Sequence, residues 1–430
     1  MKNVILISID SMRHDSLEFK TSLPTLSFIG EKGAFFSTTI VQAPFTAPSH
    51  ASMLTGLYPL HHGIRDQKGV LNANTKTIFT YAHQRGFKTA AFTGDPILSN
   101  RGFEKDIDLY DQLHLSNVKR AINILKSHHF CIFLHFWDVH TPYYTNLPIR
   151  RSQDFWANFF RITGMEKKIP RLHKDFWNYR IKRIRDMVNA DYPKIFDAVK
   201  KGYEGALKKI DLSIKKLIRI LEVEGVLKNT LIIIASDHGD SFNEHGEIYN
   251  QIERRYEHGH FLYDNIIKTF TIFYNESYIK PCTIDQQIRT IDILPTILEM
   301  WSIRPTTIDG CSLSDLLTSS PPYNFPKHAY TEIFRNDQVE PEHKRSLRTN
   351  VFKLIIDYKN NIHEFYHLKK DPQEMKNIYY NKNYRDQILI FQNELKHFLS
   401  QDKNMVDRRR KENDKDLKLI ELRLQDLGYL

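Results

Sequence analysis

The chain is organised around one stretch, Phe45-Thr46-Ala47-Pro48-Ser49-His50-Ala51-Ser52-Met53-Leu54-Thr55-Gly56. Thr46 carries a hydroxyl directly before Ala-Pro, and the residues after it are compatible with a short helix. Pro48 suits the first turn of a helix, where its missing N–H leaves no hydrogen bond unmade. The free N–H groups and the dipole of that turn favour an anionic phosphoryl or sulfuryl group. Thr46 is therefore either a helix cap, which is a common role for threonine, or a nucleophile.

Several apolar runs surround this stretch, and some of them end in acidic or imidazole groups. Such runs are typical of strands that are buried on both faces of a parallel sheet. Because the carboxyl ends of parallel strands meet at one edge of the sheet, we expect these end groups to converge, with Thr46 joining them after a strand at 35–41. The runs and their end groups are 4–9 with Asp10, 130–137 with Asp138 and His140, and 231–235 with Asp237 and His238.

The converging groups have the composition of a metal site. Asp10, Asp237 and His238 supply two carboxylates and one imidazole, and the Thr46 hydroxyl can be a fourth ligand. A divalent ion lowers the pKa of a bound hydroxyl, so that it can attack near neutral pH. We predict one divalent ion, with Mn²⁺ or Zn²⁺ favoured by the imidazole ligand and Mg²⁺ or Ca²⁺ as alternatives.

Two further histidines, His140 and His258, fall at or near the predicted site and can bind an anion or protonate a leaving group. His260 is an alternative metal ligand, and a second ion held by Asp138, His140 and His260 is a lesser alternative. The remaining histidines need no such role. We expect structural roles for His61, His62 and His83, and leave the role of His245 open.

The composition limits the partners and the compartment. The 61 Lys and Arg residues exceed the 51 Asp and Glu residues, which gives a net charge of +10 and predicts an anionic partner. The partners we consider are an anionic ester substrate and, in peripheral contact, acidic lipid or a polyanion, with no specific nucleic acid. The three cysteines show no CxxC spacing, and Cys131 reads as a buried thiol. With no signal-peptide pattern or membrane span, we expect a cytoplasmic protein, with peripheral membrane contact as an alternative.

The predicted elements divide the chain into a large α/β unit and smaller C-terminal parts. We expect a catalytic domain at 1–310, an antiparallel subdomain at 311–383 and a helical tail at 384–430. Further helices are expected at 23–32, 75–85 and 117–127, and from about 201 to 224. Within the catalytic domain, 145–200 is rich in basic and aromatic residues. It reads either as an amphipathic helical pair packed on the core or as a basic arm that contacts a membrane or substrate.

Taken together and in order, these blocks resemble the sulfatase branch of the alkaline phosphatase superfamily. The blocks are 3–13, 46–59, 62–66, 138–143, 236–240, 258–264, 292–296 and 348–372. The resemblance implies an α/β/α sandwich with a mostly parallel central sheet and a small C-terminal antiparallel sheet. It also implies one metal ion on Asp10, Thr46, Asp237 and His238, a transiently esterified Thr46, and substrate contacts from His140 and His258.

The sequence departs from the family pattern at the nucleophile, in the acidic pair and in an anion-binding block. Sulfatases carry Cys or Ser where Thr46 stands and oxidise it to formylglycine, whereas the methyl group of threonine prevents oxidation to an aldehyde. His50 replaces an Arg of the family, and Ser11 replaces the second acid of an Asp-Asp pair. Gly94-Asp95-Pro96-Ile97 stands in place of a Gly-Lys-Trp-His block. A Thr nucleophile with an Asp-His pair resembles the phosphodiesterase and the phosphoglycerol- or phosphoethanolamine-transferase relatives.

Three functions follow as hypotheses. The first is a metal-dependent hydrolase or transferase that cleaves a phosphate ester, with a diester favoured, through a covalent intermediate on Thr46. The second is a sulfuric ester hydrolase. The third is a catalytically silent metal-binding protein that docks on an anionic surface, since a fold alone does not establish activity.

Overall fold

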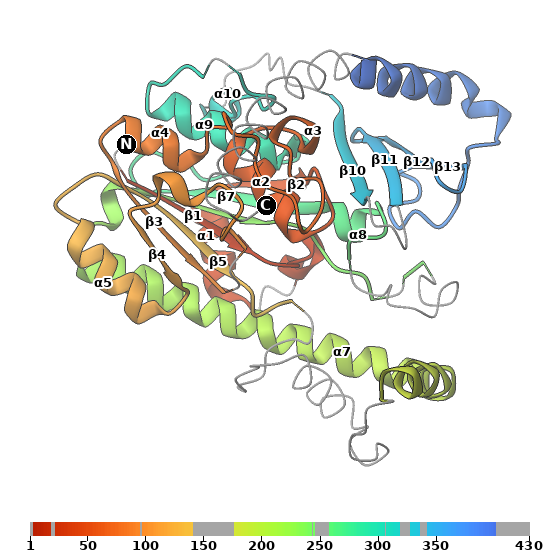
Figure 1. The fold of residues 1–430 in the computed structure, drawn as a ribbon, viewed down its shortest axis with the longest axis horizontal. Coiled ribbons are helices and arrows are strands. Elements are labelled where there is room, and N and C mark those ends of the chain that lie inside the picture. The colour runs from red at the N-terminus through yellow and green to blue at the C-terminus, as the bar shows by residue number, and fades with distance from the viewer. Residues whose placement is uncertain are drawn as a thin grey trace, which may run out of the picture.

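The computed structural model describes residues 3–18, 22–94, 97–140, 176–242, 244–245, 258–305, 307–318, 327–335 and 342–400, with the backbone alone over 176–199. Two sheets form the framework of these residues (Figure 1). The larger has nine strands in the order β4-β3-β5-β1-β6-β7-β2-β8, and β9 pairs with β2. Its strands are β1 (Asn3–Ile9), β2 (Ala34–Ile40), β3 (Lys88–Thr93), β4 (Leu109–Gln112), β5 (Phe130–Phe136), β6 (Thr230–Ser236), β7 (Lys268–Tyr274), β8 (Cys282–Ile284) and β9 (Ile288–Arg289).

The large sheet is mostly parallel, as predicted. The central strand β1 pairs in parallel with β5 and β6, and β3 pairs in parallel with β5 and β4. Strand β7 runs antiparallel to both β6 and β2. The carboxyl ends of β1, β5 and β6 therefore lie next to one another, which is the edge where sites form in open α/β sheets.

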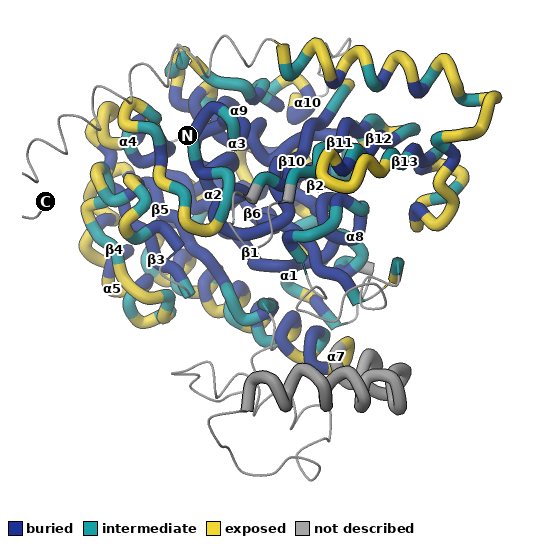
Figure 2. Tube along the Cα trace, turned by 45° about the vertical axis from the view of Figure 1, so that its right-hand side comes forward, coloured by how far each residue is buried: buried dark blue, intermediate teal, exposed yellow. Residues whose placement is uncertain are grey.

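Helices cover both faces of the large sheet, so the core has three layers (Figures 1 and 2). Alternate side chains of β1 point to opposite faces of the sheet. Val4 and Leu6 join one apolar cluster, and Ile5 and Ile7 join the other. The first cluster includes side chains of α2 (Thr46–Thr55), α4 (Ile78–Gln84), α9 (Ile293–Met300) and α10 (Ser314–Thr318). The second includes side chains of α1 (Pro24–Lys32), α5 (Leu115–Leu125) and α7 (Phe176–Val223).

The smaller sheet is antiparallel and lies beside the β2 side of the large sheet. Its strands are β10 (Ala329–Arg335), β11 (Glu342–Arg348), β12 (Phe352–Asp357) and β13 (Ile362–His367). One face packs Ile333 and Ile355 against Ile40 and Ile266 of the core, where Ile266 belongs to the short helix α8 (Asp264–Ile267). The other face is covered by a helix at 385–400. This sheet falls within the segment for which an antiparallel subdomain is predicted.

Most predicted elements match the structure in type, and the exceptions have local causes. The helix expected at 75–85 begins at Ile78 because the Thr77 side chain accepts a hydrogen bond from the backbone N–H of Thr80 and caps it. The expected start of the long helix near 201 is wrong, since α7 begins at Phe176. Most of the predicted insertion, 145–175 and the side chains to 199, lies outside the described residues, as does 401–430 of the predicted tail.

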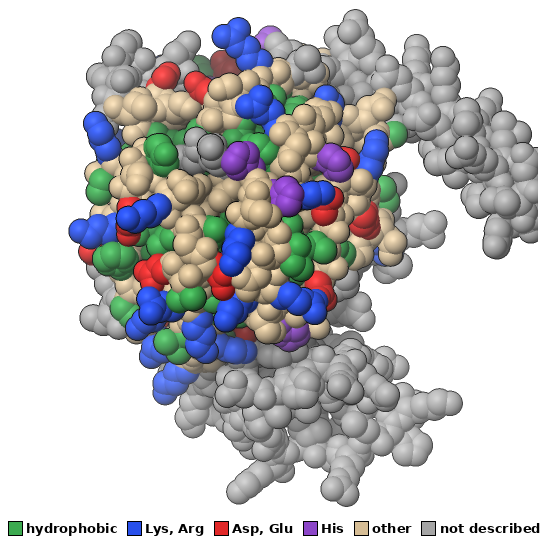
Figure 3. All heavy atoms as spheres, turned by 90° about the vertical axis from the view of Figure 1, so that its left-hand side faces the viewer, with side chains coloured by type: hydrophobic (Ala, Val, Ile, Leu, Met, Phe, Trp, Pro, Cys, Tyr) green, Lys and Arg blue, Asp and Glu red, His purple; other side chains and the backbone are tan. Residues whose placement is uncertain are grey.

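The surface agrees with the basic composition. Figure 3 shows Lys and Arg side chains gathered on the lower part of one face. Exposed basic residues on α5 and α7 include Lys119, Arg120, Lys208, Lys215 and Lys216. All three cysteines are free thiols, and Cys131 is buried as predicted. Within the described part of the chain, no helix has the length and apolar character needed to cross a bilayer.

Candidate active site

The nucleophile candidate, Thr46, is the first residue of α2. Phe45 occupies the cap position before it and makes no side-chain capping bond, so the alternative role of Thr46 as the helix cap is wrong. The Thr46 Oγ1 instead lies 3.4 Å from the Nε2 of His238. The side chain is 5% exposed, whereas His238 is fully buried. The start of α2 thus places a hydroxyl beside the predicted metal ligands.

The predicted ligands Asp10, Asp237 and His238 converge, although Asp10 is 227 residues from Asp237 in sequence. One ligand atom of each lies within 4.8 Å of the others, and all three side chains are fully buried. The His238 Nε2 is 3.4 Å from Asp237 Oδ2 and 3.8 Å from Asp10 Oδ1. Parallel pairing of β1 with β6 explains the convergence, because Ile9 lies opposite Ser236 immediately before both acids.

Backbone and serine groups fix these ligands in place. The Oδ1 of Asp237 accepts hydrogen bonds from the backbone N–H of Ser11 at 3.1 Å and of His238 at 2.9 Å. The Ser11 hydroxyl donates to Asp10 Oδ1 at 2.8 Å. Ser49, on α2, donates to the Asp237 carbonyl at 2.5 Å and so ties the nucleophile helix to β6. The backbone of Asn265 lies so close to Gly239 that a side chain at position 239 would have no room.

Burial and mutual charge shift the pKa values of the cluster in opposite directions. Burial raises the pKa of Asp10, but the His135 hydrogen bond and the nearby imidazoles outweigh it and hold that pKa well below its usual value. Burial and the Asp10 charge raise the pKa of Asp237 well above its usual value. Burial and His258 lower the pKa of His238 to about 3. The imidazole of His238 is therefore neutral. The two adjacent carboxylates repel each other when both are ionised, so the negative charge is favoured on Asp10 and disfavoured on Asp237.

This arrangement fits a divalent ion. The Oδ2 of Asp237 is buried and makes no hydrogen bond, although a buried unpaired oxygen is costly. Two carboxylates and a neutral imidazole face one another, and a cation between them would let both carboxylates ionise. The residues that would hold it are Asp10, Asp237 and His238, with the Thr46 hydroxyl beside them.

The two predicted substrate-contact histidines lie above the buried ligands. The ring of His258 is tilted 34° to that of His238, with the centroids 4.2 Å apart, and His140 lies 5.0 Å from His258 in an edge-on arrangement. The Nδ1 of His258 is 3.4 Å from the Oδ1 of buried Asp240. Both residues are partly buried, with the His258 side chain 9% exposed, whereas the ligand residues are fully buried.

The alternative second site at Asp138, His140 and His260 is not formed among the described residues. Asp138 pairs with Lys209 at 2.7 Å instead. The carbonyl of His260 accepts a hydrogen bond from the Lys344 Nζ at 2.8 Å.

The other histidines have packing or hydrogen-bonding roles. As predicted for a structural residue, His61 pairs with Asp309 at 2.6 Å, and His62 is bonded to the Ser52 hydroxyl at 3.0 Å. His83 is exposed. His245, whose role the sequence leaves open, stacks on Tyr263 with centroids 3.8 Å apart.

Two buried histidines next to the cluster were not predicted as site residues. His135 lies on β5, and its Nε2 donates to Asp10 Oδ2 at 3.1 Å. His50 lies one turn after Thr46 on α2, with Nδ1 3.7 Å from Asp237 Oδ2. The imidazole within the apolar run 130–137 was the available signal for His135. The sequence marks His50 only as a departure from the family pattern.

Residues 2–303 match the family model described as Sulfatase, and residues 253–403 match the model described as N-sulphoglucosamine sulphohydrolase, C-terminal. The first match covers most of the chain. The chain belongs to the sulfatase family. Members of the sulfatase family bind a divalent metal ion, which agrees with the ligand cluster.

Curated relatives of this sulfatase-family chain are distant but span most of its length. It is 24% identical to an N-acetylglucosamine-6-O-sulfatase of Bacteroides thetaiotaomicron, over 92% of this chain and 83% of the relative. It is 22% identical to an arylsulfatase of Clostridium perfringens, over 90% of this chain and 92% of the relative. The similar curated proteins are mostly sulfatases.

Solved structures of similar fold confirm the predicted architecture. One is a protein in complex with its substrate D-glucosamine-2-N,6-O-disulfate, with a TM-score of 0.74, 20% identity, and coverage of 94% of this chain and 98% of that one. Another is the phosphonate monoester hydrolase of Agrobacterium radiobacter, with a TM-score of 0.70, 16% identity, and coverage of 94% and 96%. At these identities the likeness establishes the fold.

Proposed function

We propose that this sulfatase-family chain is a metal-dependent hydrolase of a singly charged oxyacid ester, and that Thr46 supplies the attacking oxygen. The observation that carries the proposal is the contact between Thr46 Oγ1 and His238 Nε2, 3.4 Å, inside the cluster of Asp10, Asp237 and His238. A threonine that served only to start a helix would not need to face two buried carboxylates and an imidazole.

Each step of the proposed reaction is assigned to particular residues of the chain. The Thr46 hydroxyl gives its proton to solvent as its oxygen attacks the central sulfur or phosphorus atom, the bond to the ester oxygen breaks, and the group is transferred to Thr46. The departing oxygen takes a proton from His258 or His140, whose rings lie above the cluster. Water then attacks the Thr46 ester and returns a proton to that histidine, and the Thr46 oxygen leaves and takes up a proton from solvent. The product released is inorganic sulfate from a sulfate ester, or a phosphate monoester from a phosphate diester. A divalent ion held by Asp10, Asp237 and His238 would lower the pKa of the Thr46 hydroxyl and offset charge on the ester.

The charge of the site supports an ester with a single negative charge. The hydrogen bonds and ion pairs made to Asp10, Thr46, Asp237 and His238 by described residues come from serine, histidine and backbone groups, with no Lys or Arg. Arg13, nearby in sequence, is committed to Asp15 and Glu244. A phosphate monoester with two charges would meet little compensating charge from these residues. A sulfate monoester or a phosphate diester carries one charge.

A sulfate ester is the first candidate substrate. The curated relatives that span the chain are mostly sulfatases, and they favour this assignment over the phosphate ester that the sequence favours first. We extend it to a sulfated sugar, because one relative is an N-acetylglucosamine-6-O-sulfatase.

A phosphate diester is the second candidate, and one residue favours it. Thr46 cannot be oxidised to an aldehyde, so it must act through its own hydroxyl. A hydroxyl nucleophile beside an Asp-His metal pair is the arrangement on which the resemblance to phosphodiesterases rests. A phosphonate monoester hydrolase with the same fold shows that the fold accommodates phosphorus chemistry in a neighbour.

The proposal is tested with an aryl sulfate, N-acetylglucosamine-6-sulfate, and nitrophenyl phosphate monoesters and diesters, each with Mn²⁺ or Zn²⁺. We expect turnover of a singly charged ester and a loss of at least about 10³-fold in Thr46→Ala. The matched control is Thr55→Ala on the same helix, which we expect to keep its activity. Turnover that survives in Thr46→Ala, or the absence of turnover of every ester by the metal-loaded wild type, would contradict the proposal.

A further inference from the structure

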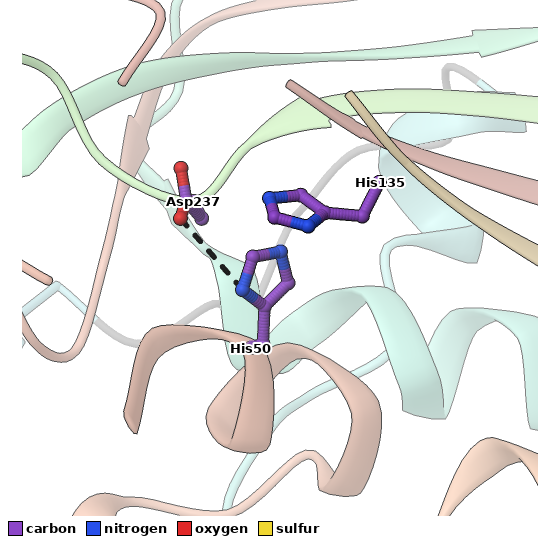
Figure 4. Close-up of side chains that lie close together, drawn as sticks. All are labelled: His50, His135 and Asp237. Atoms are coloured by element: carbon purple, nitrogen blue, oxygen red, sulfur yellow. Dashed lines mark ion pairs between the residues drawn. The ribbon is translucent and has the colours of Figure 1, made fainter. Parts of the chain in front are cut away.

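A second group of possible ligands lies against the first and includes residues that the proposed reaction does not use. It consists of His50 on α2, His135 on β5 and Asp237 at the end of β6, all fully buried. Figure 4 shows the two imidazoles and the carboxylate pointing toward one another from three separate elements. One ligand atom of each residue lies within 4.8 Å of the others.

Two polar atoms of this group have no partner in the structure. The Asp237 Oδ2 and the His135 Nδ1 are both buried and make no hydrogen bond. An unpaired buried polar atom costs about 1 to 3 kcal/mol, and more when it carries charge. Both atoms are therefore available to a ligand from outside the chain. An atom that accepts lone pairs from both a carboxylate and an imidazole is a metal cation.

The two ring nitrogens of His135 have the hydrogen-bond environment of a metal-binding histidine. Its Nε2 is 3.1 Å from Asp10 Oδ2, and because the carboxylate accepts, this nitrogen carries the hydrogen. With that hydrogen on Nε2, the unpaired Nδ1 can offer a lone pair to a cation. A ligating histidine typically donates its other N–H to a carboxylate in this way. The same bond links this group to the first site through Asp10.

His50 offers a nitrogen on the Asp237 side. Its Nδ1 is 3.7 Å from Asp237 Oδ2, which is too long for a hydrogen bond. Two ligand atoms on one ion with bonds of about 2.1 Å lie at roughly this separation. The other nitrogen, Nε2, is 2.8 Å from the Ser8 hydroxyl, which can accept its hydrogen. Ligation by Nδ1 would replace its present contact with the Thr46 carbonyl at 2.9 Å.

We infer that His50, His135 and Asp237 form a second divalent cation site, with Asp237 Oδ2 shared with the first. This inference rests on the proposed function, because it takes the site of Asp10, Asp237 and His238 to be loaded. Two neutral imidazoles and one carboxylate suit Zn²⁺ or Mn²⁺ better than Ca²⁺ or Mg²⁺. One divalent ion only cancels the charges of Asp10 and Asp237. A second leaves the cluster net positive, which would attract an anionic ester where no described Lys or Arg contacts it.

The test counts metal in the full chain after chelation and reloading with Zn²⁺ alone or Mn²⁺ alone. We expect about two ions per chain in the wild type and about one in His135→Gln and in His50→Gln. The side-chain amide introduced in His135→Gln can still donate a hydrogen bond to Asp10, so the first ion should remain bound to Asp10, Asp237 and His238. The matched control is His62→Gln, a buried histidine bonded to Ser52 outside the cluster, which should keep both ions.

A second measurement needs no variant. In Mn²⁺-loaded wild type, two ions that share a carboxylate oxygen should give the electron paramagnetic resonance spectrum of a coupled pair. One ion per chain with an uncoupled spectrum, or two ions retained in both histidine variants, would overturn the inference. One ion together with Thr46-dependent turnover would leave the proposed function standing and overturn only the second site. The absence of any bound ion would overturn both.

Discussion

The Oγ1 of Thr46 lies 3.4 Å from the Nε2 of His238, although 192 residues separate them in sequence. Helix α2 begins at Thr46 and β6 ends next to Asp237, so the contact joins the start of a helix to the edge of the sheet. The Ser49 hydroxyl holds the two elements together through the Asp237 carbonyl. The proposed chemistry depends on this junction.

Metal should stabilise the protein through Asp237. A ligand that binds only the folded state adds about 2.7 kcal/mol at a concentration 100 times its dissociation constant. We therefore expect Zn²⁺ or Mn²⁺ to raise the thermal unfolding midpoint of chelated wild type, measured by calorimetry. In Asp237→Asn the rise should disappear, because the unpaired Oδ2 is replaced by an uncharged amide. An equal rise in the variant would show that the ions bind elsewhere.

Removal of His258 should matter most for esters with poor leaving groups. A general acid contributes about 10² to 10⁴-fold, and only where the departing oxygen needs a proton. For His258→Gln we expect kcat on an alkyl ester to fall by about 10²-fold, with a much smaller fall on a nitrophenyl ester. The same comparison with His140→Gln decides which ring donates the proton. Equal losses on both esters in both variants would assign the rings to binding alone.

We expect buried polar contacts from the small sheet to stabilise the segment after His258, which contains Leu262 and Asp264. The Lys353 Nζ donates to the Leu262 carbonyl at 2.9 Å and to Asp264 at 2.8 Å, and Arg348 also pairs with Asp264 at 2.6 Å. Breaking a buried ion pair on one side costs about 3 to 5 kcal/mol. We expect Lys353→Met to lower the free energy of unfolding by about 3 kcal/mol in urea titrations. The exposed Lys359→Met is the control and should change little.

Acid stability should depend on Glu332. Burial raises the pKa of this carboxyl, but Arg65, 2.7 Å away, and the Tyr330 hydroxyl outweigh burial and lower it below its usual value. A carboxyl with a lowered folded-state pKa stabilises the fold above its unfolded pKa, and that stabilisation is lost as pH falls through the folded value. Glu332→Gln should therefore flatten the acid side of the stability–pH curve. An unchanged curve would mean that the pair contributes nothing at these pH values.

Much of the fold and site could be predicted because the signals were local. Each of the runs ending at Asp10 and Asp237 is a buried strand, and parallel pairing brings their ends together. The Thr46 position followed from the helix signal after it. The strands β4 and β8 are short and partly exposed, so no apolar run marked them. The antiparallel placement of β7 depends on long-range pairing, which sequence periodicity does not encode.

The supporting histidines could not be predicted for a related reason. His50 lies inside an otherwise ordinary helix, and His135 lies within an apolar strand. Pairing of β5 with β1 sets His135 opposite Ser8 and next to Asp10. The packing of α2 against the sheet brings His50 next to Ser8 and Asp237. The choice between sulfate and phosphate is not encoded in the spacing of the ligands, since both anions are tetrahedral.

The most direct test of the central claim is to trap the intermediate on Thr46. The metal-loaded enzyme is mixed with an excess of its best ester, quenched in acid and digested, and the peptide that contains Thr46 is examined by mass spectrometry. The account predicts that this peptide gains the mass of one sulfuryl group at Thr46, or of one phosphoryl group that keeps the second ester substituent of a diester, and that Thr46→Ala gains none. Product formed at full rate without any adduct on the Thr46 peptide would contradict it.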